Sequence, residues 1–199
     1  MIIKYLVLTC LVISVILIGI ATLIYPGGSL YDKNSMGFDW SENFFSNLFE
    51  LKAINGSVNT SRVWALIGIA FHSLGYGIFF INISKKIATR HAATILKLIG
   101  VVNLGCTFLI ATPLHDIMVT LSSTLFLIGL FYITVFILKT KLQVLKLACI
   151  ICLLIFYYTL FLYGSGHWEL LAIMQKVSFI CSMLLILGLE YFTKPADFK

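Results

Sequence analysis

The sequence predicts an all-α integral membrane protein: a six-transmembrane-helix bundle with cytoplasmic N and C termini and one structured extracytoplasmic loop. Three observations predict this fold class. Of the 199 residues, 60% are hydrophobic and 11% are charged, whereas soluble domains carry roughly 25% charged residues. The apolar residues form six runs, each close to the length of about 20 residues that crosses a bilayer. The basic residues lie in short clusters between these runs. We expect one membrane domain over residues 1–199.

Each apolar run is expected to form one helix, because a segment in lipid must satisfy its own backbone hydrogen bonds and a helix does so alone. The first run lacks a small-residue cleavage pattern, so we expect it to remain as an anchor. Pro26, Pro113 and Pro195 each lie at the end of a run, where a missing N–H costs little. The helices are predicted at about residues 5–25, 63–83, 93–112, 117–138, 147–163 and 170–192, with a long loop over residues 26–61.

The positions of Lys and Arg predict the orientation, because cytoplasmic connections carry an excess of both. One side of the predicted bundle carries most of them: Lys4, Lys85, Lys86, Arg90, Lys139, Lys141, Lys146, Lys194 and Lys199. The other side carries Lys33, Lys52 and Arg62, all in or beside the long loop. We therefore expect a plasma (inner) membrane protein with the long loop extracytoplasmic. The net charge of +6 follows these topology signals, and nucleic acid is excluded as a partner.

The long loop mixes aromatic and polar residues and differs from a disordered linker. Its segment "FDWSENFFSNLFELK" has an apolar face and a polar face, which predicts a helix lying in the membrane interface. Glycines in "PGG" and "NG" are expected to turn the chain at either side of it. Five residues of the loop are candidates for a binding role: Asp32, Asp39, Trp40, Asn43 and Asn47.

Polar side chains inside the predicted helices are costly in lipid and usually face the bundle. In the second helix His72 shares a face with Ala65, Gly68 and Gly75, and small residues let a neighbouring helix approach. His72 is therefore expected to face a partner helix. Similar polar faces carry Asn103 with Thr107 in the third helix, and Gln175 with Ser178 and Ser182 in the sixth. The candidates for a pocket gather towards the long loop, which would act as its lid: His72, Asn103, His115, Asp116, His167, Glu169, Gln175 and Lys176.

Several of these candidates also have a structural explanation. His72 could be a buried histidine bonded to Asn103 or to a backbone carbonyl. Asp116 lies at a helix start, where an aspartate is an ordinary cap. His167 and Glu169 could mark a wet turn. These alternatives compete with acid–base or ligand-binding roles for the same side chains.

The chemistry of a metal or ionic site is a further alternative. Lys176 needs a partner inside the bundle, which an ion pair with Asp116 or Glu169 or an anionic headgroup would provide. Zinc takes imidazole and carboxylate ligands, and its weak candidates are His72, His115 and His167. Nothing in their spacing requires a metal, and no residue pattern indicates a particular cofactor.

The order of "YPGGSLYD", "GFDWSENFFSNL", "NG", "PLHD" and "QK" along the chain resembles an uncharacterised bacterial multi-pass membrane protein family, described as a domain of unknown function. That family is distantly similar to the DRAM and Frag-type multi-spanning proteins. The resemblance covers essentially the whole chain. It implies a six-helix fold with a structured outer loop between the first two helices, and it implies no particular activity.

These observations favour a multi-pass membrane protein that binds a lipid or another amphipathic ligand in a pocket open to the outer leaflet, with membrane lipids as partners. One alternative is an intramembrane lipid-modifying enzyme that uses His and Asp groups, with or without a metal. Another is a small transporter, although transporter helices are usually interrupted by Gly or Pro at mid-membrane. A purely structural or partner-binding membrane protein is the remaining interpretation.

Overall fold

The computed structural model describes residues 5–110 and 112–198, and at residues 115 and 116 it describes the backbone alone. Within these ranges the chain is all-α and has six helices long and apolar enough to cross a membrane, which confirms the predicted fold class to that extent. The helices are α1 (Leu6–Leu23), α2 (Arg62–Lys86), α3 (Arg90–Leu109), α4 (His115–Ile137), α5 (Gln143–Ser165) and α6 (Trp168–Phe192).

The observed helix bounds differ from the predicted ones where polar residues continue a helix. α5 begins at Gln143 and includes Lys146, although the apolar run begins after both residues. α2 likewise continues through Lys85 and Lys86. Long basic side chains can extend from a helix end towards water while their stems stay in apolar surroundings. Hydropathy therefore marks the lipid-facing part of these helices and misses their polar ends.

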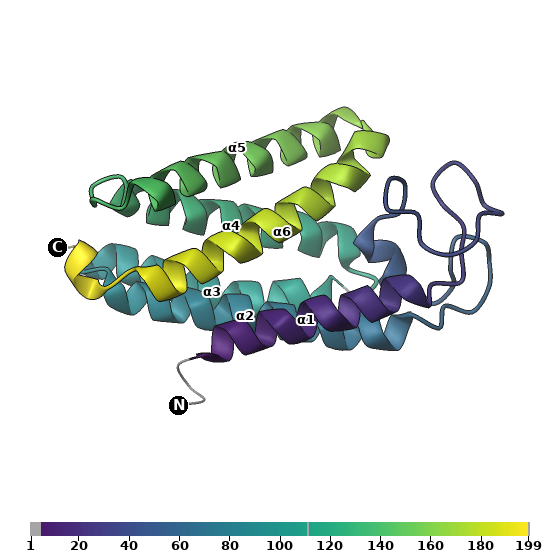
Figure 1. Ribbon diagram of the computed structural model, residues 1–199, viewed down its shortest axis with the longest axis horizontal. Coiled ribbons are helices and arrows are strands. Elements are labelled where there is room, and N and C mark those ends of the chain that lie inside the picture. The colour runs from purple at the N-terminus through teal and green to yellow at the C-terminus, as the bar shows by residue number, and fades with distance from the viewer. Residues whose placement is uncertain (1–4, 111, 199) are drawn as a thin grey trace.

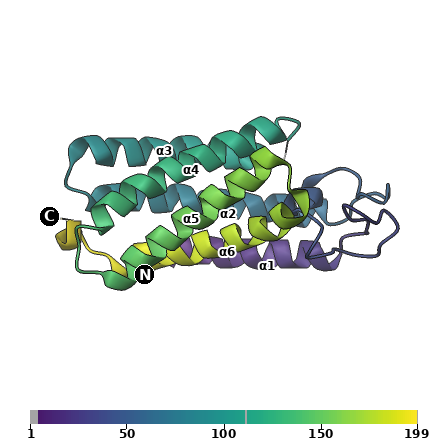
Figure 2. The same cartoon turned by 90° about the horizontal axis from the view of Figure 1, so that it is seen from above.

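The six helices run roughly along one axis (Figures 1 and 2). α2 lies at the centre and contacts α1, α3 and α6. The long loop lies at one end of the bundle together with the α3–α4 and α5–α6 connections, and we call this the loop end (Figure 1). The start of α1 and the end of α6 lie at the opposite end, the termini end. In Figure 1 α6 runs obliquely and moves away from α1 and α2 towards the loop end.

Small residues let α2 approach both of its neighbours in the sequence. A Cβ added at Gly68 would lie 2.9 Å from Cγ1 of Ile18 in α1. On the α3 side, a Cβ added at Gly100 would lie 2.6 Å from Cβ of Phe80 and 3.1 Å from the carbonyl oxygen of Gly77. Side chains at these glycines would push the helices apart. The small-residue face predicted for the second helix therefore packs against a neighbouring helix, α1.

The interfacial helix predicted in the long loop is wrong. The segment forms turns and the short 3-10 helix η2 (Phe45–Phe49), whose Phe45, Leu48 and Phe49 side chains are buried in a cluster with residues of α1 and α2. These three apolar side chains thus face the protein, whereas Trp40 and Leu51 of the same segment are exposed. A compact loop also requires close backbone contacts: Gly28 has φ +83°, and a Cβ there would overlap Asn55.

At the termini end α6 is tied to α2 by polar side chains that the sequence analysis did not single out as a pair. Asn82 Nδ2 donates to Glu190 Oε1 at 2.8 Å. Lys86 Nζ donates to the carbonyl oxygens of Leu189 and Glu190 and to the hydroxyl of Thr193. These bonds hold α6 against α2 at the end opposite the long loop.

Candidate ligand-binding cavity

A cavity of about 460 Å³ lies inside the bundle towards the loop end. All six helices and η2 contribute to its lining, from Ile18 of α1 to Ser182 of α6. We call it the bundle cavity. Its volume falls in the range of about 300–1,000 Å³ that is usual for small-molecule sites. His72, Asn103 and Gln175, which the sequence analysis named as pocket candidates, all line it.

The long loop covers the bundle cavity, as its predicted role as a lid requires. Phe44, Phe45, Ser46 and Phe49 all line the cavity. Two bonds fix this segment to α6: the N–H of Phe45 donates to Gln175 Oε1 at 2.8 Å, and the amine of the next residue, Lys176, also binds the loop. The loop therefore fills the space that opens where α6 departs from α1 and α2.

His72 is buried in the cavity wall, with 7% of its surface exposed. Its ring lies between those of Tyr76 and Phe179, with centroid distances of 4.1 and 4.7 Å. Nδ1 is buried and has no hydrogen-bond partner. The expected structural bond to Asn103 or to a backbone carbonyl is therefore not made by this nitrogen. Buried polar atoms are normally paired, so His72 stands out in the lining.

Six hydroxyl groups of the cavity wall pair with one another. Three such pairs join different helices: Tyr76 with Ser182 at 2.6 Å, Thr107 with Ser122 at 2.9 Å, and Thr159 with Ser178 at 2.8 Å. They link α2 to α6, α3 to α4, and α5 to α6. Sequence reasoning found the faces that hold Thr107, Ser178 and Ser182. It missed Tyr76, which follows His72 by one helical turn and could have been found by that spacing.

The described part of the cavity lining contains aromatic, aliphatic, hydroxyl, amide and imidazole side chains, and no Asp, Glu, Lys or Arg. An ion placed in such a wall would lose its hydration without gaining an opposite charge, which is unfavourable in apolar surroundings. The described wall of the cavity is therefore amphipathic without being ionic. It suits a largely apolar molecule that carries a few hydrogen-bonding groups.

Lys176 lies beside the cavity and does not line it. It is 7% exposed, and its amine donates to the carbonyl oxygens of Asn43 at 2.6 Å and Ala172 at 2.7 Å. The amine also lies 5.7 Å from the ring centroids of Phe38 and Phe45. Its partners are thus carbonyls and ring faces, and not the Glu169 carboxylate that the sequence analysis considered.

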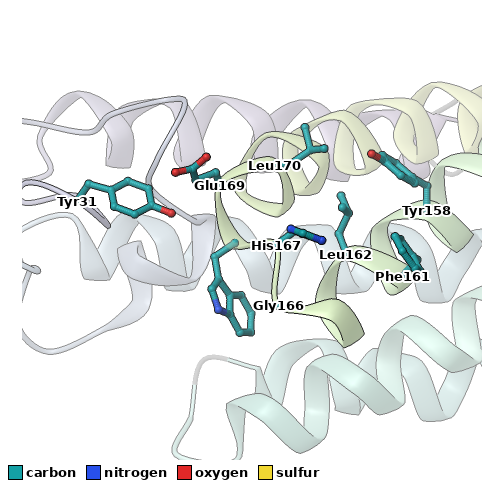
Figure 3. Close-up of a pocket in the computed structure, with 9 residues that line it drawn as sticks. Tyr31, Tyr158, Phe161, Leu162, Gly166, His167, Glu169 and Leu170 are labelled. Carbon is teal, nitrogen blue, oxygen red and sulfur yellow. The ribbon is translucent and has the colours of Figure 1, made fainter.

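His167 and Glu169 lie in a second pocket of about 370 Å³ at the α5–α6 turn, which we call the turn pocket. In Figure 3 Glu169 lies on the same side of the pocket as Tyr31, a residue of the long loop. His167 points the other way, towards Leu162 and Phe161. Both side chains are exposed, which agrees with a wet turn. The structure thus separates these two candidates from the ones in the bundle cavity.

The side chains of His115 and Asp116 lie outside the described residues, so their predicted roles stay predictions. Among the described residues no group of three or more His, Cys, Asp or Glu side chains could hold a metal ion. His72 and His167, two of the weak zinc candidates, line different pockets. The structure does not bring these two histidines together at one site.

The five loop candidates contribute mainly to the structure of the loop itself. Asn43 is fully buried, donates to the carbonyl of Gly28 and accepts from the N–H of Asp39. Asn47 lies in η2, and the other three lie at turns or on the surface. Asp32 accepts from the N–H of Asn34, Asn47 accepts from the N–H of Phe44, and the half-exposed Trp40 packs edge-on against Phe38 and Phe45.

Asp39 closes a turn just before the part of the long loop that lines the bundle cavity. Its carboxylate accepts hydrogen bonds from the hydroxyl and the N–H of Ser41 and from the N–H of Glu42. These bonds favour the charged form, and the bonds from Ser41 in particular lower the pKa of Asp39 below its ordinary value. Asp39 therefore shapes the loop and does not face the bundle cavity.

The chain matches no protein-family model, no curated protein and no solved structure. Its function must therefore be inferred from the geometry and chemistry of the bundle cavity.

Proposed function

We propose that this multi-pass membrane protein binds a lipid or another amphipathic ligand in the bundle cavity. One observation carries the proposal: a cavity of about 460 Å³ with an uncharged polar wall, within the described side chains, lies in a bundle of membrane-length helices under the long loop. Such a cavity combines apolar surface for chains with a few polar groups for a head. The unpartnered His72 offers one of these polar groups.

We further propose that the protein lies in the plasma membrane with the long loop outside, because the basic connections gather at the termini end. The bundle cavity would then lie in the half of the bundle that faces the outer leaflet. His72 follows the start of α2 by ten residues, which is a depth of about 15 Å at 1.5 Å per residue. A lipid that enters from the outer leaflet could place its head near His72.

The test is a variant that fills the cavity. Ser123 lines the bundle cavity and belongs to none of the three hydroxyl pairs. We expect Ser123→Phe to reduce the amount of lipid that native mass spectrometry detects on the purified protein by about tenfold or more, since a misfit of about 1–3 kcal/mol corresponds to that range of affinity.

The matched control is Ile128→Phe, at an exposed position of the same helix. It adds an aromatic ring to the lipid-facing surface and should leave the bound lipid unchanged. Circular dichroism would verify that both variants keep the helical fold. The proposal would be wrong if Ser123→Phe retained its lipid, or if the wild-type protein carried none and took up none from mixed-lipid vesicles.

A further inference from the structure

Outside the interhelical hydroxyl pairs, the bundle cavity is lined by several side chains that carry nitrogen donors. Six of the lining hydroxyls are already paired across helices. Besides the half-exposed Trp168, three nitrogen-bearing side chains from three helices line the cavity: His72 of α2, Asn103 of α3 and Gln175 of α6. His72 and Asn103 are more than nine-tenths buried. Because buried N–H groups are normally hydrogen-bonded, these side chains favour a ligand that carries hydrogen-bond acceptors.

The orientation of Gln175 follows from its bond to the long loop. Its Oε1 accepts the backbone N–H of Phe45, and a backbone N–H can only donate. The Nε2 amide group of Gln175, which has two N–H donors, is therefore the end left for the cavity. In the structure Asn103 Oδ1 accepts from the Thr107 hydroxyl at 3.5 Å, which leaves its Nδ2 amide group as the end free for a ligand. Each amide thus has N–H donors available to a ligand.

The proton of His72 can be assigned by the same reasoning. Nδ1 is buried without a partner, and a proton there would leave a buried N–H donor unpaired, which is rare and costly. We therefore place the proton on Nε2 in the neutral ring. His72 then presents a third N–H donor, held in place by the stacked rings of Tyr76 and Phe179.

Resting on the proposed function, we infer that the ligand is an uncharged lipid whose head presents carbonyl oxygens to His72, Asn103 and Gln175. The donors call for acceptor oxygens, and the described lining offers no charged side chain to a phosphate or a carboxylate. Rings of Phe126, Phe156 and Phe179 complete the wall and suit acyl, prenyl or ring carbons. Two lipid classes share this chemistry: glycerol esters and prenyl quinones.

The experiment compares four probes by the rise in unfolding temperature of the detergent-solubilised wild-type protein, titrated to saturation. Dioleoylglycerol and decylubiquinone represent the two sources of carbonyl oxygens. Dioleylglycerol ether has the same glycerol and chain lengths as the first probe but lacks its carbonyls. Dioleoylphosphatidic acid keeps the ester carbonyls and adds a charged phosphate. We expect at least one carbonyl probe to bind about tenfold or more tightly than both the ether and the phosphatidate.

Variants then test two of the three donors. His72→Phe keeps an aromatic ring between Tyr76 and Phe179 but removes the N–H, and Asn103→Leu removes the amide at similar size. Each should weaken binding of the preferred carbonyl probe about threefold to tenfold, as expected for one uncharged hydrogen bond, without changing the affinity for the ether. Leu74→Phe, at an exposed position of α2, is the matched control and should change neither affinity.

The wild-type comparison decides the inference even if a variant fails to fold. Equal affinity for the ester and the ether, or tightest binding of the phosphatidate, would overturn the assignment of a neutral carbonyl lipid while leaving lipid binding itself in place. Failure of all four probes to bind would overturn this assignment, whereas the proposed function is decided separately by whether the wild-type protein carries lipid or takes it up from mixed-lipid vesicles. Preference for dioleoylglycerol over decylubiquinone, or the reverse, supports the assignment and identifies the source.

Discussion

Lys176 shows at the scale of one residue how the long loop is fixed to the bundle. A charged side chain inside a membrane helix is costly and persists only with partners. Here the amine donates hydrogen bonds to the carbonyl oxygens of Asn43 in the loop and Ala172 in α6. It also lies within the range of cation–π attraction of two phenylalanine rings. The charge that seemed suited to an anionic ligand instead holds the lid.

This role predicts that Lys176→Met releases the loop. The variant keeps the length of the side chain but leaves the Asn43 carbonyl without its donor, and a hydrogen bond to a charged group contributes about 1.5–3 kcal/mol. Trypsin can measure the release, because Lys33 and Lys52 are exposed in the loop. We expect cleavage there to become about tenfold faster or more, since proteolysis follows local opening.

The control for this prediction is Lys194→Met, which removes an exposed lysine at the termini end. It should leave the cleavage rate at Lys33 and Lys52 unchanged. Equal cleavage of the wild-type protein and Lys176→Met would show that the amine does not hold the loop. The remaining contacts, including the Gln175 bond to Phe45, would then suffice.

At the scale of elements, the close approach of α2 and α3 sets the spacing between His72 and Asn103, which these helices carry. Their contact depends on Gly77 and Gly100, because a Cβ at Gly100 would overlap Phe80. Phe80 is fully buried and cannot easily move away. A small residue in α3 thus controls a distance between two groups that line the bundle cavity.

Gly100→Ala is therefore expected to destabilise the protein by about 1–3 kcal/mol, the usual effect of an extra methyl group in a packed core. Gly105→Ala in the same helix is the control, because a Cβ there meets nothing within 4 Å, and alanine is the better helix former. Chemical unfolding in detergent would measure both. If the two substitutions had equal effects, the tight α2–α3 contact would not be a source of stability.

The elements show where sequence reasoning works and where it stops. Hydropathy located all six helices, since lipid selects long apolar runs whatever their neighbours. Helical spacing placed His72, Asn103 and Gln175 on inward faces, and the structure brings them to one cavity. The segment of the long loop over residues 38–52 was wrongly predicted as an interfacial helix, because an apolar face has the same sequence pattern whether it packs against lipid or against α1 and α2. The hydrogen bond from Lys176 to the Asn43 carbonyl joins residues far apart in the chain. Neither neighbouring sequence contains a pattern that predicts it.

At the scale of the whole molecule, the two ends of α6 are held differently. At the termini end Asn82 and Lys86 of α2 bind Glu190 and its neighbours. At the loop end α6 binds the long loop instead, through Gln175 and Lys176. The bundle cavity lies between these attachments. An opening of the cavity at the loop end would therefore break the loop contacts and the Tyr76–Ser182 bond between α2 and α6, while the α2–α6 contact at the termini end stays closed.

The orientation of the molecule in the membrane can be tested with single cysteines. The described cysteines are free and lie in helices, buried or half-buried, so the background reaction with a membrane-impermeant maleimide should be low. Ser57 in the long loop and Lys141 between α4 and α5 are both exposed and lie at opposite ends. Because basic connections stay in the cytoplasm, intact cells should label Ser57→Cys and not Lys141→Cys, and lysed cells should label both. Labelling of Lys141→Cys alone in intact cells would invert the topology, and the bundle cavity would then face the cytoplasmic leaflet and draw its lipid from there.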